Sequence, residues 1–396
     1  MLMRLNYLVA LFTSFVIASL ATTSSLAQNS AAEFHNILRE NLALDEMDLA
    51  ALQHGQTVVK LLPVDDKQAV AVAGVVELQV PAQVFLESFR ENLATKSNPA
   101  ILEIGRFSTE PTLADLKDLT FERRDIEDLK TCVVGSCQLK LSARMIERLQ
   151  NEIHWDGPNY VAEATQLLKL MLLDYVRDYQ ARGEVALIEY SDKEKPVRLA
   201  DDQGAQKGVS TYFNGRLTSS SNSTLTTIEN AIVWSKIKFG LKPVIAINHI
   251  TIDKSQSDNG PQILVTTKQI YANHYFTSSL ASTAFVNVPG TNPASYLIYE
   301  NRSRADALRG PFSGIKRGLV RDKALNGLTA ILEHSKLSLS ARALGQTGST
   351  MPIERSRNWR RWRRAGILLI FLLFSVAAVA VLIALSSNYR WKSETT

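Results

Sequence analysis

The chain has 396 residues, with a formal net charge of +5 and a pI near 9.0. Most of the excess positive charge lies at the two ends. Residues 28–354 have a net charge of −3. This value is what remains of +5 after subtracting +1 for Arg4, +6 for the six arginines before a C-terminal apolar segment, and +1 for the residues after that segment. A mildly acidic body without a basic stripe argues against nucleic acid as a partner.

The N-terminus has the pattern of a secretory signal peptide over residues 1–27. Arg4 is followed by an apolar stretch from Tyr7 to Ala21, and the small residues "SLA" end at Ala27. This order of charge, apolar core and small residues is typical of a cleaved signal. An uncleaved signal anchor is the alternative, and both interpretations place an exported domain at residues 28–344.

Early in this domain the pattern predicts a strand, a helix and a second strand. Val70–Val80 alternates as a strand does, and Pro81 opens a helix in which Phe85, Phe89 and Leu93 share a face. Ile101–Phe107 predicts the next strand.

The two cysteines, Cys132 and Cys137, flank the turn signal Gly135-Ser136. We predict a strand over Lys130–Leu141 and a disulfide across a tight hairpin, because a nearby pair in an exported domain oxidises. A redox-active pair, a zinc site and a haem attachment are the alternatives. They lack the usual spacing or further ligands, so no metal is expected.

The middle of the chain predicts helices and then mostly strands. We expect two helices and a short strand, then one further helix and a run of strands before a long closing helix. In chain order these are Ala143–Ile153, Pro158–Arg182, Glu184–Tyr190, Ile228–Phe239, Val244–Ile252, Ile263–Ala272, Phe276–Val288, Ser295–Glu300 and Phe312–Lys336. Neighbouring strands with helices gathered at the ends indicate an α+β fold with an antiparallel sheet.

Two stretches resemble the helix-grip fold of START-like and polyketide-cyclase-like proteins. They are "AGVVELQVPAQVFLESFRE" at Ala73–Glu91 and "GIKRGLVRDKALNGLTAILE" in the closing helix. The resemblance implies a long C-terminal helix across a curved sheet, with a cavity for an apolar or lipid-like ligand. The helices between residues 143 and 182 would be an insertion. The chain also resembles exported bacterial membrane-anchored proteins of unknown function.

The C-terminal region predicts a membrane anchor. A linker and juxtamembrane segment at residues 345–364 precede Ala365–Leu385, whose 21 uncharged residues would span about 31 Å as a helix. Residues 386–396 would form a short cytoplasmic tail. We expect a single-pass membrane protein with its main domain on the periplasmic or extracellular side. The side chains expected at anionic lipid headgroups are Arg355, Arg357, Trp359, Arg360, Arg361, Trp362, Arg363 and Arg364.

Candidate ligand-binding residues lie on or beside the late strands. Asparagine-histidine pairs occur at His249 and His274, and Arg302 and Arg304 follow a predicted strand, where they could receive a carboxylate or phosphate. The predicted binding set is His249, Tyr271, His274, Tyr275, Phe276, Phe285, Arg302 and Arg304.

We assign no catalytic residue or cofactor, since nucleophile-elbow, phosphate-loop, dinucleotide and zinc-protease motifs are absent from the sequence. Binding of a lipid-like ligand is the leading expectation. An envelope protein–protein interaction role, with a partner that the sequence does not identify, is the alternative. A hydrolase or isomerase using His249 and His274 is a third hypothesis.

Overall fold

The computed structural model describes residues 32–94, 100–204, 227–238, 242–257, 260–288, 295–308 and 313–347. The predicted signal peptide, the apolar segment at 365–385, its arginine- and tryptophan-rich flank and the tail lie outside these residues. None of the described helices has the length and apolar character needed to cross a bilayer.

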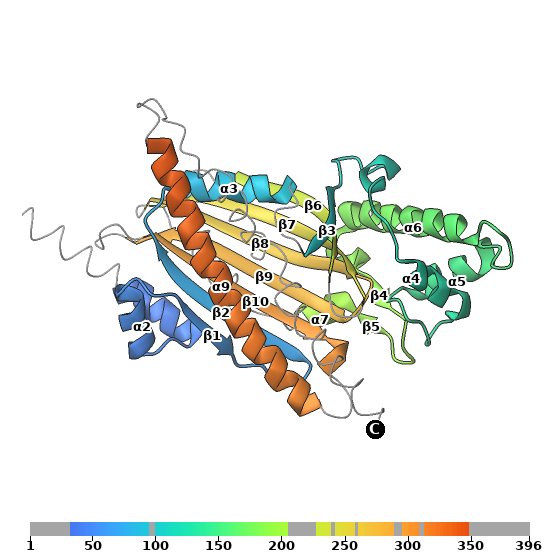
Figure 1. Ribbon diagram of the computed structural model, residues 1–396, viewed down its shortest axis with the longest axis horizontal. Coiled ribbons are helices and arrows are strands. Elements are labelled where there is room, and N and C mark those ends of the chain that lie inside the picture. Colours follow the sequence, from blue (N-terminus) through green and yellow to red (C-terminus); the bar gives the residue numbers. More distant parts are fainter. Residues whose placement is uncertain are drawn as a thin grey trace, which may run out of the picture.

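A large antiparallel sheet forms the centre of the described structure, which confirms the α+β prediction (Figure 1). Its strand order is β1-β2-β10-β9-β8-β7-β6-β3. The strands are β1 (Val58–Leu62), β2 (Ala69–Leu78), β3 (Ile101–Arg106), β6 (Thr227–Ile237), β7 (Val244–Ser257), β8 (Gly260–Ala272), β9 (Phe276–Asn287) and β10 (Ser295–Ala305).

Two helices cover one face of this sheet. The long helix α9 (Ser313–Thr347) crosses it diagonally, and α3 (Ala82–Ala94) lies beside it (Figure 1). The predicted closing helix is therefore confirmed, although it ends at Thr347, inside the segment predicted as a linker. Phe85 of α3 stacks on Phe285 of β9 at a centroid distance of 5.4 Å, within a packed apolar cluster that includes Leu328 and Leu332 of α9.

The opposite face of the sheet is covered at one end by two N-terminal helices. A helix over residues 32–42 and α2 (Glu46–Gln53) bury Phe34, Leu38 and Leu52 against β1, β2, β9 and β10. Neither helix was predicted from the sequence.

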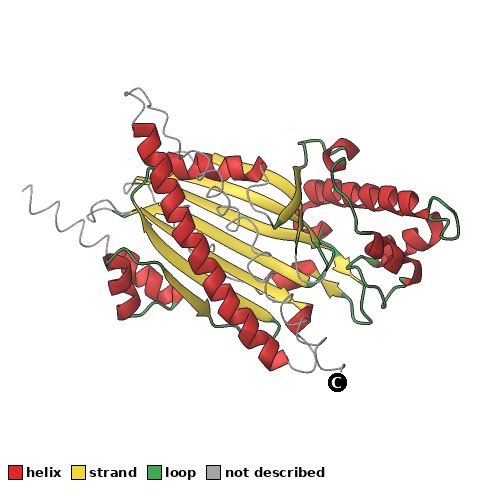
Figure 2. Cartoon of the chain, viewed as in Figure 1, coloured by secondary structure: helices red, strands yellow, loops and turns green. Residues whose placement is uncertain are grey.

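A mostly helical part lies between β3 and β6 in the chain and, in space, extends past one end of the strands (Figure 2). Its predicted helices are confirmed as α5 (Ala143–Glu152) and α6 (Tyr160–Arg182). Its other elements are η1 (Leu113–Leu116), α4 (Arg123–Asp128), η2 (Leu129–Thr131), η3 (Gly183–Ala186), β4 (Glu189–Tyr190), β5 (Val197–Arg198) and α7 (Leu199–Gly204). One apolar cluster joins this part to β6, β7 and β8.

Cys132 and Cys137 form the predicted disulfide. Gly135 has the positive φ of 88° that a tight turn between them requires. The strand predicted over Lys130–Leu141 is wrong, however, because the segment begins in η2. The turn is held instead by backbone hydrogen bonds from Gly135 and Cys137 to Ser191 and Asp192.

The helix predicted over Ile228–Phe239 is also wrong, since residues 227–237 form β6. Strand β6 has apolar side chains on both faces: Trp234 packs in the cluster of the helical part, and Val233 packs in the cluster under α9. Residues Glu184–Tyr190 form η3 and then only a two-residue strand, β4.

Candidate ligand-binding site

The residues predicted to bind a ligand do not form one site. His249 lies on β7, on the face of the sheet opposite α9, and its imidazole is hydrogen-bonded on both nitrogens. The distance from Nδ1 to the Tyr179 hydroxyl is 2.8 Å, and the distance from Nε2 to Asn230 Oδ1 is 3.0 Å. Burial, with a smaller effect of Lys268, lowers the pKa of His249, so the neutral ring is favoured.

His274 lies in a different group, in the turn between β8 and β9. Its Nε2 donates to Asp125 Oδ2 of α4 at 2.9 Å, and Asp125 also accepts from Lys242 Nζ at 2.8 Å. These contacts tie the helical part to the end of the sheet. The two histidines therefore have separate partners, and the geometry gives the two-histidine acid–base hypothesis no support.

The predicted aromatic residues are also dispersed. Phe285 is buried in the cluster under α9, Phe276 in a cluster around the first half of α9, and Tyr271 in the cluster of the helical part. Tyr275 adopts a positive φ of 58°, and its hydroxyl accepts a hydrogen bond from the backbone of Lys242. These rings act as packing or turn residues rather than as a shared lining.

Arg302 and Arg304 line a small pocket of about 220 Å³ together with Asp65, Asp66 and Asp202. Arg304 is committed to ion pairs with Asp66 and Asp202, both at 2.6 Å. Arg302 Nε donates to Glu300 at 2.6 Å. The three aspartates of this pocket would repel an anion, so the pocket is a weaker anion site than the sequence suggested.

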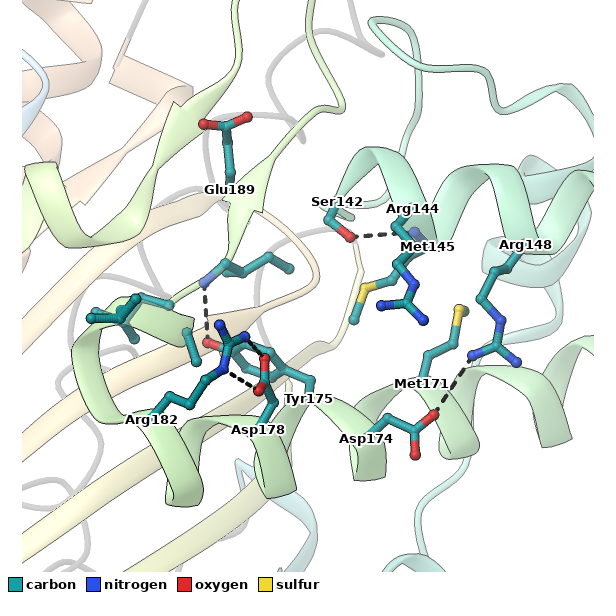
Figure 3. Close-up of a pocket in the computed structure, with 14 residues that line it drawn as sticks. Ser142, Arg144, Met145, Arg148, Met171, Asp174, Tyr175, Asp178, Arg182 and Glu189 are labelled. Atoms are coloured by element: carbon teal, nitrogen blue, oxygen red, sulfur yellow. Dashed lines mark hydrogen bonds and ion pairs between the residues drawn. The ribbon is translucent and has the colours of Figure 1, made fainter.

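A larger pocket, of about 530 Å³, lies between α5 and the second half of α6 (Figure 3). Its volume is in the range of small-molecule sites. It is lined by Ser142, Arg144, Met145, Arg148, Met171, Asp174, Tyr175, Asp178, Arg182, Val185, Ala186, Leu187, Ile188 and Glu189. We call this the α5–α6 pocket.

The floor of the α5–α6 pocket is apolar. Met145 of α5, Met171 of α6 and the segment Ala186–Ile188 contribute side chains that are nearly buried. The Tyr175 hydroxyl donates to the backbone oxygen of Ile270 at 2.6 Å, and burial raises its pKa, so it stays neutral. Methionine side chains adapt to ligands of irregular shape.

The rim of the pocket has charges of both signs. Arg148 pairs with Glu152 at 2.6 Å, and Arg182 forms a two-pronged pair with Asp178. That pair lowers the pKa of the Asp178 carboxyl and raises the pKa of Arg182. Arg148 and Arg182 are thus largely neutralised by carboxylates of the protein itself.

Arg144 and Glu189 are different. Neither side chain has a hydrogen bond or ion pair to another part of the chain that the structure describes. The guanidinium of Arg144 points from α5 toward α6, whereas the exposed Glu189 lies at the rim with its carboxylate pointing away from the other labelled side chains (Figure 3). The charge of Arg144 also helps to lower the pKa of Asp178. The pocket therefore has an arginine without a close ion pair beside its apolar floor and an exposed glutamate at its rim.

Sequence reasoning predicted the two helices of this pocket but not its polar residues. Arg144 and Glu189 are ordinary surface types in the sequence, and only the packing of α5 on α6 brings them to one cavity. The stretch that contains Glu189, "EVALIEY" at Glu184–Tyr190, is the one local signal, and it indicated a strand.

Comparison with known proteins identifies no relative: no family model, curated protein or solved structure matches the chain.

Proposed function

We propose that the protein binds an amphipathic molecule in the α5–α6 pocket, and that its headgroup is zwitterionic. The observation that carries this proposal is the apolar floor of a pocket whose lining includes Arg144, which points toward α6, and Glu189, an exposed carboxylate at the rim. A phosphate or carboxylate would bind Arg144, and an ammonium would bind Glu189.

The apolar part of the ligand would lie on Met145, Met171 and Leu187. A headgroup with only negative charge would meet Asp174, Asp178 and Glu189 on the rim, which disfavours it. The proposal keeps the lipid-like ligand expected from the sequence but moves it from the sheet to the helical part.

We further propose that the domain is exported and anchored by residues 365–385. The disulfide between Cys132 and Cys137 supports export, because such bonds persist in oxidising compartments. Strand β2 pairs with β10, and β3 forms the far edge of the sheet. This strand order supports a helix-grip arrangement in which the helical part is an insertion between β3 and β6. These features suit a binding protein at a membrane surface.

The test is calorimetric titration of the full-length chain, held in amphipol, with a lysophosphatidylethanolamine. Lysophosphatidic acid and a monoacylglycerol with the same acyl chain serve as the anionic and neutral comparisons. We expect the zwitterion to bind most tightly, and Arg144→Gln and Glu189→Gln each to weaken it about fivefold.

Arg123→Gln is the matched control, because Arg123 is an exposed α4 arginine outside the pocket and pairs with Glu127. It should bind the zwitterion as the unmodified chain does. Equal affinity for all three lipids, or unchanged affinity after both pocket substitutions, would show that the α5–α6 pocket is not the site.

A further inference from the structure

Lys140 lies in a buried position where the helical part meets the end of the sheet. It follows the disulfide turn, and its backbone nitrogen donates to the backbone oxygen of Asn273, in the turn between β8 and β9. Its side chain is only 5% exposed, and its Nζ lies 4.7 Å from the centre of the Tyr190 ring. A lysine amine is thus held in a largely apolar place, where charge is costly.

Asp306 is the ion-pair partner of Lys140. It begins η4 (Asp306–Leu308), directly after β10, and is 166 residues further along the chain. Its Oδ2 is 2.7 Å from Lys140 Nζ, and its Oδ1 accepts a hydrogen bond from Thr277 Oγ1 at 3.0 Å. The carboxyl group is therefore oriented with one oxygen against the amine and the other against a hydroxyl donor.

A second carboxyl group, that of Asp192, lies near the same amine. Its Oδ1 is 3.9 Å from Lys140 Nζ, and its side chain is 5% exposed. Burial raises the pKa of Asp192, an effect that the charge of Lys140 opposes and the charge of Asp306 reinforces. Asp192 therefore takes up a proton more readily than an ordinary aspartate does.

This arrangement favours joining the amine to the carboxyl group. Taking an amine and a carboxylate out of water carries a penalty that their mutual attraction repays only in part, and an amide between them has no charge. Two separate molecules in water do not condense in this way to a useful extent. In a fixed arrangement the reaction is intramolecular, with effective concentrations of about 10⁵ M or more for well-oriented groups.

We propose that Lys140 and Asp306 condense to an isopeptide bond that joins the helical part to the end of β10. Lys140 Nζ gives a proton to Asp306 Oδ2 and attacks Asp306 Cγ as the neutral amine. The hydrogen bond from Thr277 stabilises the negative charge that develops on Oδ1. Asp192 takes a second proton from the nitrogen and passes it to Oδ2, which leaves as water. One C–N bond forms, one C–O bond breaks, and no oxidant or cofactor is needed.

The test is the mass of the full-length chain, denatured and with its disulfide reduced. We expect a mass that is lower by one water molecule than the sequence requires, and a branched peptide in a digest that joins residues 140 and 306. Lys140→Arg cannot form the bond and should have its full sequence mass. Asp306→Asn should reach the same final mass as the unmodified chain, because loss of ammonia from the asparagine leaves the same amide.

Lys242 is a control within the same chain, because its Nζ lies 2.8 Å from Asp125 Oδ1. Burial alone would raise the pKa of Asp125, but hydrogen bonds from His274 and Lys242 hold it below its usual value. This carboxylate stays ionised, so no branched peptide should form at Lys242.

Asp192→Asn removes the group that carries the proton and keeps its shape. It should slow the condensation at least about tenfold, so that uncondensed chain remains after purification. Thermal unfolding of Lys140→Arg and Asp192→Asn verifies that both variants fold, and the mass of the unmodified chain needs no variant.

The proposal is overturned if the folded, unmodified chain has its full sequence mass or if the branched peptide joins another pair of residues. It is also overturned if Asp192→Asn condenses as completely as the unmodified chain. None of the residues at Lys140 lines the α5–α6 pocket and no lipid takes part, so each of these results is independent of the lipid titration.

Discussion

Leu332 of α9 packs directly on Gly74 of β2. A Cβ atom built on Gly74 would lie 2.4 Å from Leu332 Cδ1 and 3.2 Å from Leu328 Cδ2. The missing side chain therefore determines how closely the long helix approaches the sheet. At this point the contact between α9 and the sheet is tight.

Gly74→Ala should destabilise the protein. The added methyl group has no space unless the Leu332 side chain or α9 shifts, and overpacking of this kind costs about 1–3 kcal/mol in the free energy of unfolding. Gly318→Ala is the matched control, because Gly318 is exposed on α9 with nothing within 4 Å of its added Cβ. It should stabilise the helix by about 0.5–1 kcal/mol. Urea unfolding of both variants measures the difference.

Loss of the disulfide should also destabilise the protein. Replacing Cys132 and Cys137 together by serine opens a short loop, and the expected loss is about 2 kcal/mol in the free energy of unfolding. Because both cysteines are nearly buried, a thiol reagent should detect no free sulfhydryl after mild reduction of the folded chain. Reduction in denaturant should release two. Equal unfolding midpoints for the unmodified chain and the double variant would contradict this expectation.

The sequence predicted strands best where one face is polar or the strand is a continuous apolar run. Strands β2, β7, β8 and β9 have such patterns, and all four were predicted. Strand β6 was not, because both of its faces are covered and its apolar residues therefore have no alternation. The end of β10 was missed because Asn301 and Ser303 are buried there in a hydrogen-bonded group with Ser279, which sequence patterns do not distinguish from a loop.

The candidate sites were harder to predict than the fold. Of the predicted binding residues, His249 lines a substantial pocket, but its partners Tyr179 and Asn230 come from distant parts of the chain. Arg144 has no sequence context that separates it from other surface arginines. Its place beside the α5–α6 pocket is a property of tertiary packing.

The ion pairs around Asp125 should make stability depend on pH below about pH 5. Burial alone would raise the pKa of Asp125, but hydrogen bonds from His274 and Lys242 hold it below its usual value of 3.8. Because the pKa is lower in the folded state, the carboxylate stabilises the fold above the unfolded-state pKa. This contribution is lost as the pH falls through the folded-state pKa. Urea unfolding between pH 3 and 7 measures it.

Asp125→Asn should remove this part of the pH dependence and leave Lys242 with one carboxylate, Asp128. Breaking a buried pair typically costs about 3 kcal/mol or more in the free energy of unfolding. Asp128→Asn is the control, because Asp128 pairs with the same lysine but is more exposed, and its loss should cost about 1 kcal/mol or less. An equal loss in the free energy of unfolding for the two substitutions would refute the expectation that the buried Asp125 pair stabilises the fold more than the Asp128 pair.

Gln269→Met should stabilise the protein. The side chain of Gln269 is completely buried on β8 beside its cross-strand neighbour Asn248. Neither its oxygen nor its nitrogen has a hydrogen-bond partner among the residues that the structure describes. Methionine has a similar shape without the cost of burying unpaired polar atoms, about 1–3 kcal/mol for each such group. In contrast, Gln150→Met removes a hydrogen bond to the backbone of Leu129 and should destabilise. A lower unfolding midpoint for Gln269→Met would show that the amide is paired in solution, with ordered water or a bound molecule as its partner.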